Sequence, residues 1–426
     1  METEAGGMEA GAGEQTLELA ERHITRAEAA HTLVASFLGW TLDAFDFFVL
    51  VFVIPTIATE FHRPIADLAL AITATLAMRP VGALVFGWIA DRYGRRTPLM
   101  ADIIFYSVVE VASGLAPNYA TFLVLRALYG IGMGGEWGVG AALAMEAVGT
   151  RRRGFFSGLL QEGYAVGYLL AAAAYFFVFP HFGWRPLFFL GGLPALLTIY
   201  IRMKVPESEA WERTRPDLKA IMGAIRSNLR LFLYLVVLMT MMNLVSHGTQ
   251  DLYPTFLQLQ RGLDARTVAT IAIIYNIGAL AGGLAFGYLS DRWGRRTTMA
   301  TAVGLGALLV PLWIYPRSLE MLTLGAFLMQ FMVQGAWGVI PAHLAELSPP
   351  EVRGLFSGLA YQLGVLFASN AAFGEAALAR RIDYGSALAL VGATVLVGAA
   401  IVILMGGERK GRILHSTRGA AAIRAV

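Results

Sequence analysis

Twelve long apolar stretches, separated mostly by short polar segments, constrain this chain more than any other feature. A helix that crosses a bilayer needs about 20 mostly apolar residues. Only helices and closed barrels satisfy their backbone polar groups in lipid. The sequence therefore predicts an all-α integral membrane protein with 12 transmembrane helices. The predicted spans are 34–57, 67–90, 97–115, 119–148, 154–178, 184–202, 231–256, 267–290, 297–315, 319–347, 354–378 and 385–406.

The composition supports a membrane protein and excludes several classes of site. Hydrophobic residues make up 57% of the chain and charged residues 15%, whereas soluble domains carry about 25% charged residues. Cysteine is absent, which excludes disulfides, thiolate metal sites and cysteine nucleophiles. We expect no metal and no cofactor. Because the basic residues form short clusters between apolar stretches, the lipid bilayer is an expected partner and nucleic acid is not.

The distribution of Lys and Arg predicts the orientation in the membrane. Most of the 33 basic residues lie in the N-terminal tail, in every second loop and in the C-terminal tail. The positive-inside rule then places both termini in the cytoplasm and the chain in the inner or plasma membrane. We expect a monomer made of a tail, a six-helix bundle, a charged linker, a second bundle and a second tail, at 1–32, 33–202, 203–230, 231–406 and 407–426.

An internal repeat relates the two predicted bundles. A shift of 200 residues aligns "FGWIADRYGRRT" at 86–97 with "FGYLSDRWGRRT" at 286–297. The two predicted bundles are therefore parallel copies related by an axis along the membrane normal, which is an arrangement used for alternating access. The same shift aligns the segment "FSGL" at 156–159 and 356–359 and three further pairs, Trp137 with Trp337, Glu146 with Glu346, and Arg153 with Arg353.

The doubled motif G-x-x-x-D-R-x-G-R-R, after the second and eighth spans, resembles the major facilitator superfamily of transporters. The resemblance covers nearly the whole chain and implies a charge network that closes the cytoplasmic face. The alternative, which does not exclude a gate, is that the arginine clusters only hold these loops inside. The predicted gate residues are Gly87, Asp91, Arg92, Arg95, Glu146, Arg153, Asp291, Arg292, Arg295, Glu346 and Arg353.

The seventh predicted span ends in an unusually polar stretch, "NLVSHGTQDLYPTF" at 243–256. At 100° per residue, its polar side chains fall on one face about 140° wide, which must meet protein or water because ionisable groups avoid lipid. Hydrogen-bonding glue between helices is the alternative interpretation. The residues on this face are Asn243, Ser246, His247, Gln250, Asp251 and Pro254.

This stretch also carries a more specific resemblance. The pattern N-x-x-[S/T]-H-x-[S/T]-Q-D-x-x-x-T is similar to the signature of lactate/pyruvate:proton symporters, which belong with the sialate:proton symporters. "LDAFDFF" at 42–48 and "RPVGALVFG" at 79–87 also resemble that group. The linker is too short and charged for the extra pair of spans found in many sialate carriers, which favours the monocarboxylate branch. The matching residues are Asn243, Ser246, His247, Thr249, Gln250, Asp251 and Thr255.

Charged residues in other spans are candidates for proton and substrate binding. Asp43 and Asp46 share a helix face, and two adjacent carboxylates in a dry site rarely both ionise. They could carry a proton or make helix-packing hydrogen bonds. An arginine suits a carboxylate substrate because its fork binds both oxygens. We expect Arg126 rather than Arg79 to be this anchor, since the fourth span commonly lines the cavity in the family. Glu136 could be a second proton site or the counter-ion of Arg126.

Together these features predict a secondary-active, proton-coupled symporter of a small organic acid anion, most simply lactate or pyruvate. A proton-driven exporter of drugs or metabolites and uptake of sialate or another organic acid are alternatives, and an intramembrane enzyme using His247 and Asp251 is a remote one. The expected substrate-binding residues are Arg126, Asn243, Ser246, His247 and Gln250; the proton-coupling residues are Asp43, Asp46, Glu136, His247 and Asp251; and weaker cavity candidates are Gln161, Glu162, Gln330, Gln334, His343, Gln362 and Asn370.

Overall fold

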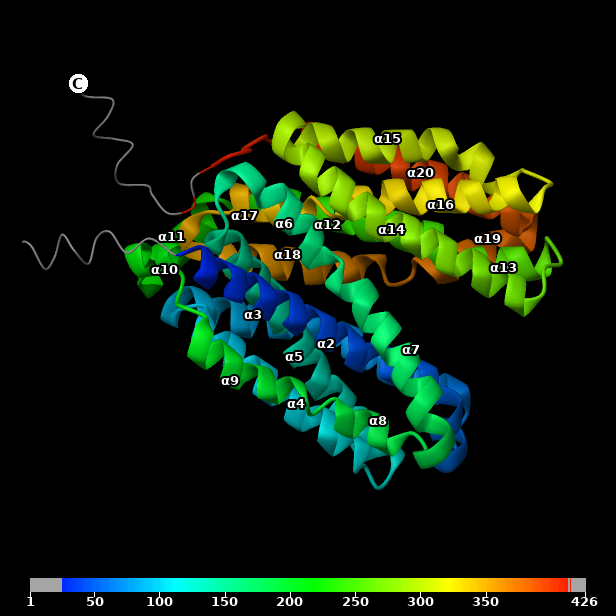
Figure 1. The fold of residues 1–426 in the computed structure, drawn as a ribbon, viewed down its shortest axis with the longest axis horizontal. Helices are drawn as coiled ribbons and strands as arrows, with labels where there is room; N and C mark the ends of the chain where they lie inside the picture. The colour runs from blue at the N-terminus through cyan, green and yellow to red at the C-terminus, as the bar shows by residue number, and fades with distance from the viewer. Residues whose placement is uncertain (1–24, 413, 415–426) are drawn as a thin grey trace, which may run out of the picture.

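A computed structural model of the chain describes residues 25–412 and 414, and all the regular elements in this part are helices. Twelve rods run along the molecule, six in each half (Figure 1), so the predicted all-α, twelve-helix architecture is confirmed. The rods of the N-terminal half are α2 (Arg26–Glu60), α3 (Ile65–Tyr93), α4 (Arg96–Gly114), α5 (Tyr119–Ala147), α6 with α7 (Arg153–Gln161 and Gly163–Phe182) and α8 with α9 (Arg185–Leu190 and Pro194–Lys204).

The C-terminal half repeats this plan. Two short helices, α10 (Glu209–Thr214) and α11 (Leu218–Ser227), lie in the linker between the halves. The rods of the second half are α12 with α13 (Leu229–Gln250 and Tyr253–Leu259), α14 (Ala265–Trp293), α15 (Arg295–Ile314), α16 with α17 (Leu319–Trp337 and Ile340–Leu347), α18 with α19 (Arg353–Ala368 and Ala371–Ile382) and α20 (Tyr384–Met405).

The rods differ in detail from the predicted spans. Among the described helices, nine rods can cross a membrane by length and composition alone, whereas α4, α5 and α18 with α19 are less apolar or interrupted. The first rod begins at Arg26, inside the segment predicted as a tail. Residues 1–24, 413 and 415–426, which include the rest of the predicted tails, lie outside the described residues. Five rods are broken into two helices, which the apolar pattern did not indicate.

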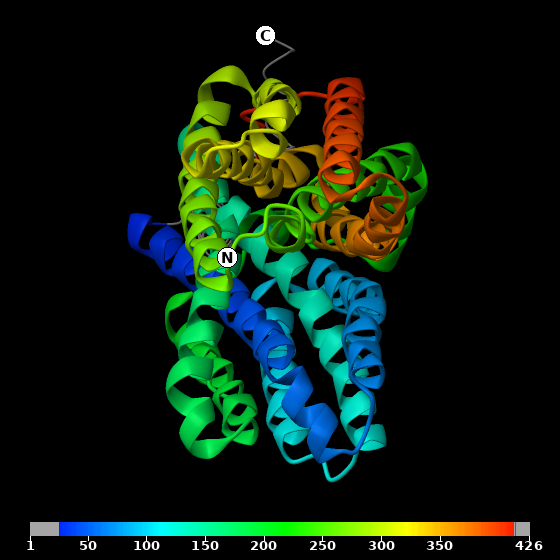
Figure 2. The ribbon, with the colours of Figure 1, turned by 90° about the vertical axis from the view of Figure 1, so that its right-hand side faces the viewer.

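The two halves meet at one end of the molecule and diverge at the other. Figure 1 shows them converging where α10 and α11 lie, which we call the linker end, and separating toward α7 and α13. Figure 2 shows the two bundles stacked one above the other in the perpendicular view. The contacts between the halves are made mainly by α3 and α5 with α18, and by α6 with α14.

Glycines allow the halves to approach closely at the linker end. A Cβ atom on Gly138 would lie 2.5 Å from the Cα of Gly358 in the other half. One on Gly87 would lie 2.9 Å from the Cα of Leu355. Small residues at such crossings let helix backbones pack directly. The second glycine of the motif, Gly94, has a different role from Gly87. It turns the chain from α3 into α4 at a φ of 110°, which residues with a side chain rarely adopt.

Candidate functional site

The repeated motif builds a buried charge network that joins the halves at the linker end. Glu146, at the end of α5, forms ion pairs with Arg353 of the other half at 2.6 Å and with Arg95 of its own half at 3.5 Å. Asp91 forms an ion pair with Arg95 and accepts the backbone N–H groups of Gly354 and Leu355 at 3.1 and 2.9 Å. These two residues begin α18, so a carboxylate of the first half caps a helix of the second.

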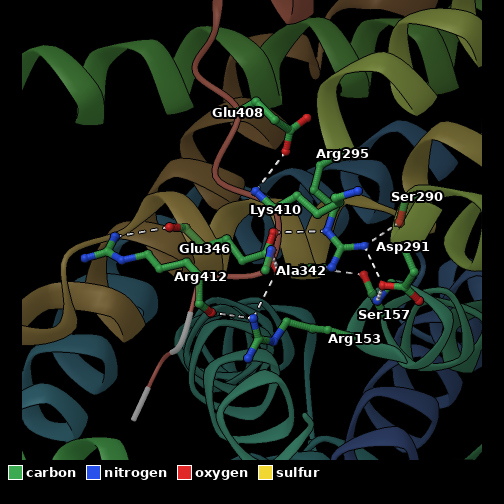
Figure 3. Close-up of polar contacts among 12 residues, drawn as sticks. Arg153, Ser157, Ser290, Asp291, Arg295, Ala342, Glu346, Glu408, Lys410 and Arg412 are labelled. Atoms are coloured by element: carbon green, nitrogen blue, oxygen red, sulfur yellow. Dashed lines mark hydrogen bonds and ion pairs between the residues drawn. The ribbon is translucent and has the colours of Figure 1, made fainter. Parts of the chain in front are cut away.

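A second network repeats the first with the halves exchanged (Figure 3). Glu346 forms ion pairs with Arg295 at 3.0 Å and with Arg153 of the N-terminal half at 3.1 Å. Asp291 pairs with Arg295 at 2.8 Å and accepts the backbone N–H of Gly154, at the start of α6, also at 2.8 Å. Each half therefore binds the other through equivalent ion pairs and helix caps, and these contacts hold the two halves together at the linker end.

Two of the predicted gate arginines, and the uncharged Gly87, remain outside these networks. Arg92 lies over the ring of Tyr93, 5.3 Å from its centroid. Arg292 is exposed and donates to the Tyr288 hydroxyl at 2.6 Å. Both contacts are local to one helix or its end. The first arginine of each D-R-x-G-R-R motif therefore does not join the halves in this structure.

The linker adds contacts that the sequence analysis missed. The Glu207 carboxylate accepts the backbone N–H of Arg95 at 2.7 Å, and the Ser208 hydroxyl donates to Glu146. The Trp211 indole donates to the Asp91 carbonyl at 2.9 Å. Burial raises the pKa of Glu207 above its ordinary value, although the backbone N–H donors act in the opposite direction.

The segment after the last span contributes in the same way. Glu408 accepts the backbone N–H of Arg296 at 2.8 Å, and the backbone N–H of Gly411 donates to Glu346 at 3.3 Å. Arg153 donates to the carbonyl of Arg412 at 2.9 Å. Because these segments follow the sixth and twelfth spans, the internal repeat was the signal that could have identified them, although Glu207 and Glu408 are 201 residues apart rather than 200.

Five aromatic side chains from both halves pack together above the charge networks, and we call them the aromatic cluster. The Tyr361 ring stacks on Trp137 with centroids 4.3 Å apart and meets the edge of Trp337 at 5.9 Å. Trp40 lies edge-on to Trp137 at 6.4 Å and stacks on Tyr164 at 5.5 Å. Since Trp137 precedes Glu146 by nine residues on α5, the cluster lies about 13 Å along the helix from the gate.

Arg79 lies beside the aromatic cluster where the two halves meet. Its guanidinium is 5.8 Å from the centroid of the Tyr361 ring, which belongs to α18 of the other half. The residue is only 4% exposed, and its Nε and Nη2 groups have no hydrogen-bond partner in the described part of the chain. Arg79 also interacts electrostatically with Asp43 of α2. An unsatisfied buried donor is costly, so this guanidinium can accommodate an anionic ligand.

Arg126, the expected substrate anchor, is instead enclosed within the N-terminal half. It is 0% exposed, forms an ion pair with Glu110 of α4, and donates to the Ser113 hydroxyl at 2.6 Å. The rings of Tyr129 and Phe188 lie 4.6 and 5.2 Å from its guanidinium carbon. The counter-ion of Arg126 is therefore Glu110 and not Glu136, while its Nε and Nη1 groups have no hydrogen-bond partner among the described residues.

The N-terminal half holds more buried carboxyl groups than the sequence analysis considered. The three expected proton-coupling residues of this half are all buried, namely Asp43, Asp46 and Glu136. Asp102 and Glu110 of α4 are buried as well. Tyr129 donates to the backbone carbonyl of Asp43 at 3.0 Å. Both oxygens of Asp46 and of Asp102 have no hydrogen-bond partner among the described residues. Because unpaired buried carboxylates are costly, these groups are candidates for proton binding.

The polar face of the seventh span divides into an open and a closed part. His247 and Asp251 are 37% and 36% exposed and pair at 2.9 Å. Gln250 donates to Gln330 at 2.8 Å. Asn243, in contrast, is buried and donates to the carbonyl of Met239 on its own helix at 2.8 Å. The helix breaks within this face, between Gln250 and Tyr253, so Asp251 lies at the break and Pro254 follows it.

The remaining candidates lie in different surroundings. Ser246 and Thr255 are half-buried, whereas the Thr249 hydroxyl donates to its own helix. His343 is fully buried in the C-terminal half, and both of its ring nitrogens are without a partner in the described residues. Asn370 is exposed at the break between α18 and α19, and Gln161 has a buried, unpartnered carbonyl oxygen.

A family comparison identifies the architecture. The sequence model of the Major Facilitator Superfamily matches residues 36–369 and 252–422 of this chain. The chain belongs to this family. Among curated relatives, the carboxylic acid transporter protein homolog of Saccharomyces cerevisiae is 31% identical, over 89% of this chain and 68% of its own. The sialic acid transporter NanX of Escherichia coli is 30% identical, over 89% of this chain and 94% of its own.

Solved structures of the family share the fold. The proton:xylose symporter XylE superposes with a TM-score of 0.75 at 18% identity, over 91% of this chain and 98% of that one. The predicted membership of the major facilitator superfamily is therefore confirmed. The chain is a multi-pass membrane transporter and not an enzyme, as expected.

The gate of this major facilitator protein can be tested through one carboxylate. Asp91→Asn removes the charge that pairs with Arg95 and caps α18, so it should weaken the closed linker end. The reporter is Ser157→Cys, because the Ser157 hydroxyl accepts the backbone N–H of Ala342 across the interface. We expect thiol labelling of this cysteine, in a chain without others, to be about tenfold faster in Asp91→Asn, as a loss of about 1.4 kcal/mol gives.

The matched control is Arg92→Gln, which changes the adjacent residue of the same motif outside the network. Its labelling rate should equal that of the parent. Equal rates in Asp91→Asn and the parent would show that Asp91 does not hold the linker end closed.

Proposed function

We propose that this transporter is a proton-coupled symporter of a small organic acid anion, a monocarboxylate such as lactate or pyruvate. The observation that carries the proposal is Arg79, a guanidinium with unpartnered N–H groups beside Tyr361 at the junction of the halves. A planar fork of this kind matches a carboxylate. Several relatives are named as transporters of carboxylic acids, including sialic acid, niacin and cis,cis-muconate.

The proposed anion site lies above the aromatic cluster. The carboxylate binds Arg79, and the half-buried Ser246 and Gln250 of the seventh span are the partners that we propose on the C-terminal side of this space. The packed rings of Trp137 and Tyr361 limit the depth of this space. We therefore expect a short substrate rather than a bulky drug, which disfavours the exporter alternative.

The proposed proton sites surround this anion. The open pair His247 and Asp251 can take a proton from the far side of the membrane. Asp43, which interacts electrostatically with Arg79, connects the anion site to the buried carboxyl groups of the N-terminal half. Proton and anion together neutralise the site, so that the halves can rock about it. We place both termini, the linker and the gate in the cytoplasm of a cell bounded by the inner or plasma membrane.

Uptake into proteoliposomes tests this function. At an inward gradient of one pH unit, each coupled proton should support about tenfold accumulation of labelled lactate or pyruvate. A protonophore should abolish it. Acetate and sialate are tested in parallel. A strong preference for sialate would contradict the monocarboxylate assignment and support the alternative of sialate uptake. Accumulation that depends on sodium and resists the protonophore would refute proton coupling.

A further inference from the structure

Glu162 reaches from the N-terminal half into the C-terminal half. It lies at the break between α6 and α7 and is 7% exposed. Its Oε1 atom occupies the space beside Gly283 of α14, where any Cβ atom would collide with it. The carbonyl oxygen of Gln334, on α16, borders the same space. The gate and anion site described above use neither Glu162 nor this contact.

The repeat gives Glu162 a neutral counterpart. A shift of 200 residues places Gln362 at the equivalent position on α18. Gln362 is fully buried, and its amide donates to the carbonyl of Gly134 at 3.5 Å across the interface. Gly134 is itself the repeat equivalent of Gln334. The two halves thus place repeat-equivalent side chains at the crossing between them, a titratable acid on one side and a permanently neutral amide on the other.

The surroundings of Glu162 contain no group to stabilise a negative charge. The helix α14 presents Gly283 and α16 presents Gln334, while α2 presents Trp40 and Thr41 beside the adjacent Gly163. No charged or titratable side chain of the described residues on α2, α14, α16 or α17 acts on it, and its carboxyl has no hydrogen-bond partner there. An unpaired carboxylate in such a place is costly, whereas the protonated acid is neutral and carries a donor, like Gln362.

We propose that Glu162 is a proton-coupling residue whose protonation holds the halves together at the linker end and whose ionisation favours their separation. Protonated, it fits the crossing contact with Gly283 as Gln362 fits the contact with Gly134. When the halves part on that side, the carboxyl meets water and releases its proton there. This assignment rests on the proposed proton-coupled transport and adds a site of proton release to it.

The test replaces Glu162 by the residue of its repeat equivalent. Glu162→Gln should retain the exchange of labelled for unlabelled substrate, which needs no net proton movement. It should lose about tenfold accumulation at one pH unit, the amount that one coupled proton supplies. If the wild type itself shows no proton-driven uptake, the proposed function fails. If Glu162→Gln accumulates substrate like a proton-driven wild type, this inference alone fails.

A second readout does not depend on transport. The Ser157→Cys reporter should label faster as the pH rises, because ionised Glu162 weakens the interface. The ratio of its rate with and without Glu162→Gln, taken at each pH, cancels the ionisation of the thiol itself. A ratio that does not change with pH would overturn the proposal. If Glu162→Gln fails to fold, Gln362→Glu replaces it and should steepen the pH dependence of labelling, and an unchanged slope would overturn the proposal.

Discussion

Arg126→Gln should strongly destabilise the N-terminal half without removing the preference for an anionic substrate. The substitution leaves Glu110 buried without its ion-pair partner, at a site with 0% exposure on both side chains. Breaking such a pair costs about 3–5 kcal/mol. The measurement is thermal unfolding of the purified protein, followed by binding of lactate and of its uncharged amide to whatever fraction remains folded.

A double variant supplies the control for this loss. Arg126→Leu combined with Glu110→Leu removes both charges, so it should be less destabilising than Arg126→Gln, because no buried charge remains unpaired. Glu110→Gln alone should be nearly as damaging as Arg126→Gln. A stable Arg126→Gln protein that no longer distinguishes lactate from its amide would return the anchor role to Arg126.

Arg79→Gln should have the largest effect on substrate binding. A charge-assisted hydrogen bond contributes about 1.5–3 kcal/mol, so the loss of one weakens lactate binding by roughly ten- to a hundredfold. Folding should be little changed, since Nε and Nη2 have no hydrogen-bond partner to lose among the described residues. The wild type should prefer lactate to its amide, and Arg79→Gln should bind both equally.

Arg79→Lys separates charge from geometry. It retains the positive charge but loses the planar fork, so it should restore binding only in part. Full restoration would show that charge alone suffices. If Arg79→Gln keeps the wild-type affinity for lactate, the anion site must lie elsewhere, and the open His247–Asp251 pair becomes the first place to look.

The charge networks at the linker end could be predicted closely because the sequence information for them is local and doubled. The repeated motif identifies Asp91 and Asp291 together, and both occupy equivalent contacts. The linker contacts of Glu207 and Ser208 were missed because these residues lie in a polar segment, where acids and serines are common. Their position after the sixth span of the repeat, rather than their residue type, indicates that they contact the charge network.

The different surroundings of the two arginines could not be predicted from one sequence. Depth in a span follows from the position along the chain, but the direction in which a side chain points depends on how the helix is rotated against its neighbours. Arg126 points toward Glu110 on α4, and Arg79 toward Tyr361 on α18. Glu110 itself, a carboxylate inside a predicted span, was a visible signal for a buried ion pair.

The broken helices were also beyond the apolar pattern. The rod of α6 and α7 divides at Glu162 without a proline, whereas Pro254 lies in the first turn of α13 after the break in the seventh span. A proline at that position loses no helical hydrogen bond. The breaks place Glu162 and Asp251 at points where helix backbone ends, which periodicity along an apolar stretch does not record.

The charges of the gate cancel within each half, and this has a consequence for the electrical behaviour of the transporter. Asp91, Arg95, Glu146 and Arg153 belong to the N-terminal half, and their repeat equivalents belong to the C-terminal half. Each set contains two carboxylates and two guanidiniums. A membrane potential of 100 mV does about 2.3 kcal/mol of work on each elementary charge that crosses it, but rocking a neutral set moves no net charge. In the proposed transport cycle, voltage therefore acts on the substrate anion and the coupled protons, whereas the movement of these two neutral charge networks is electrically silent.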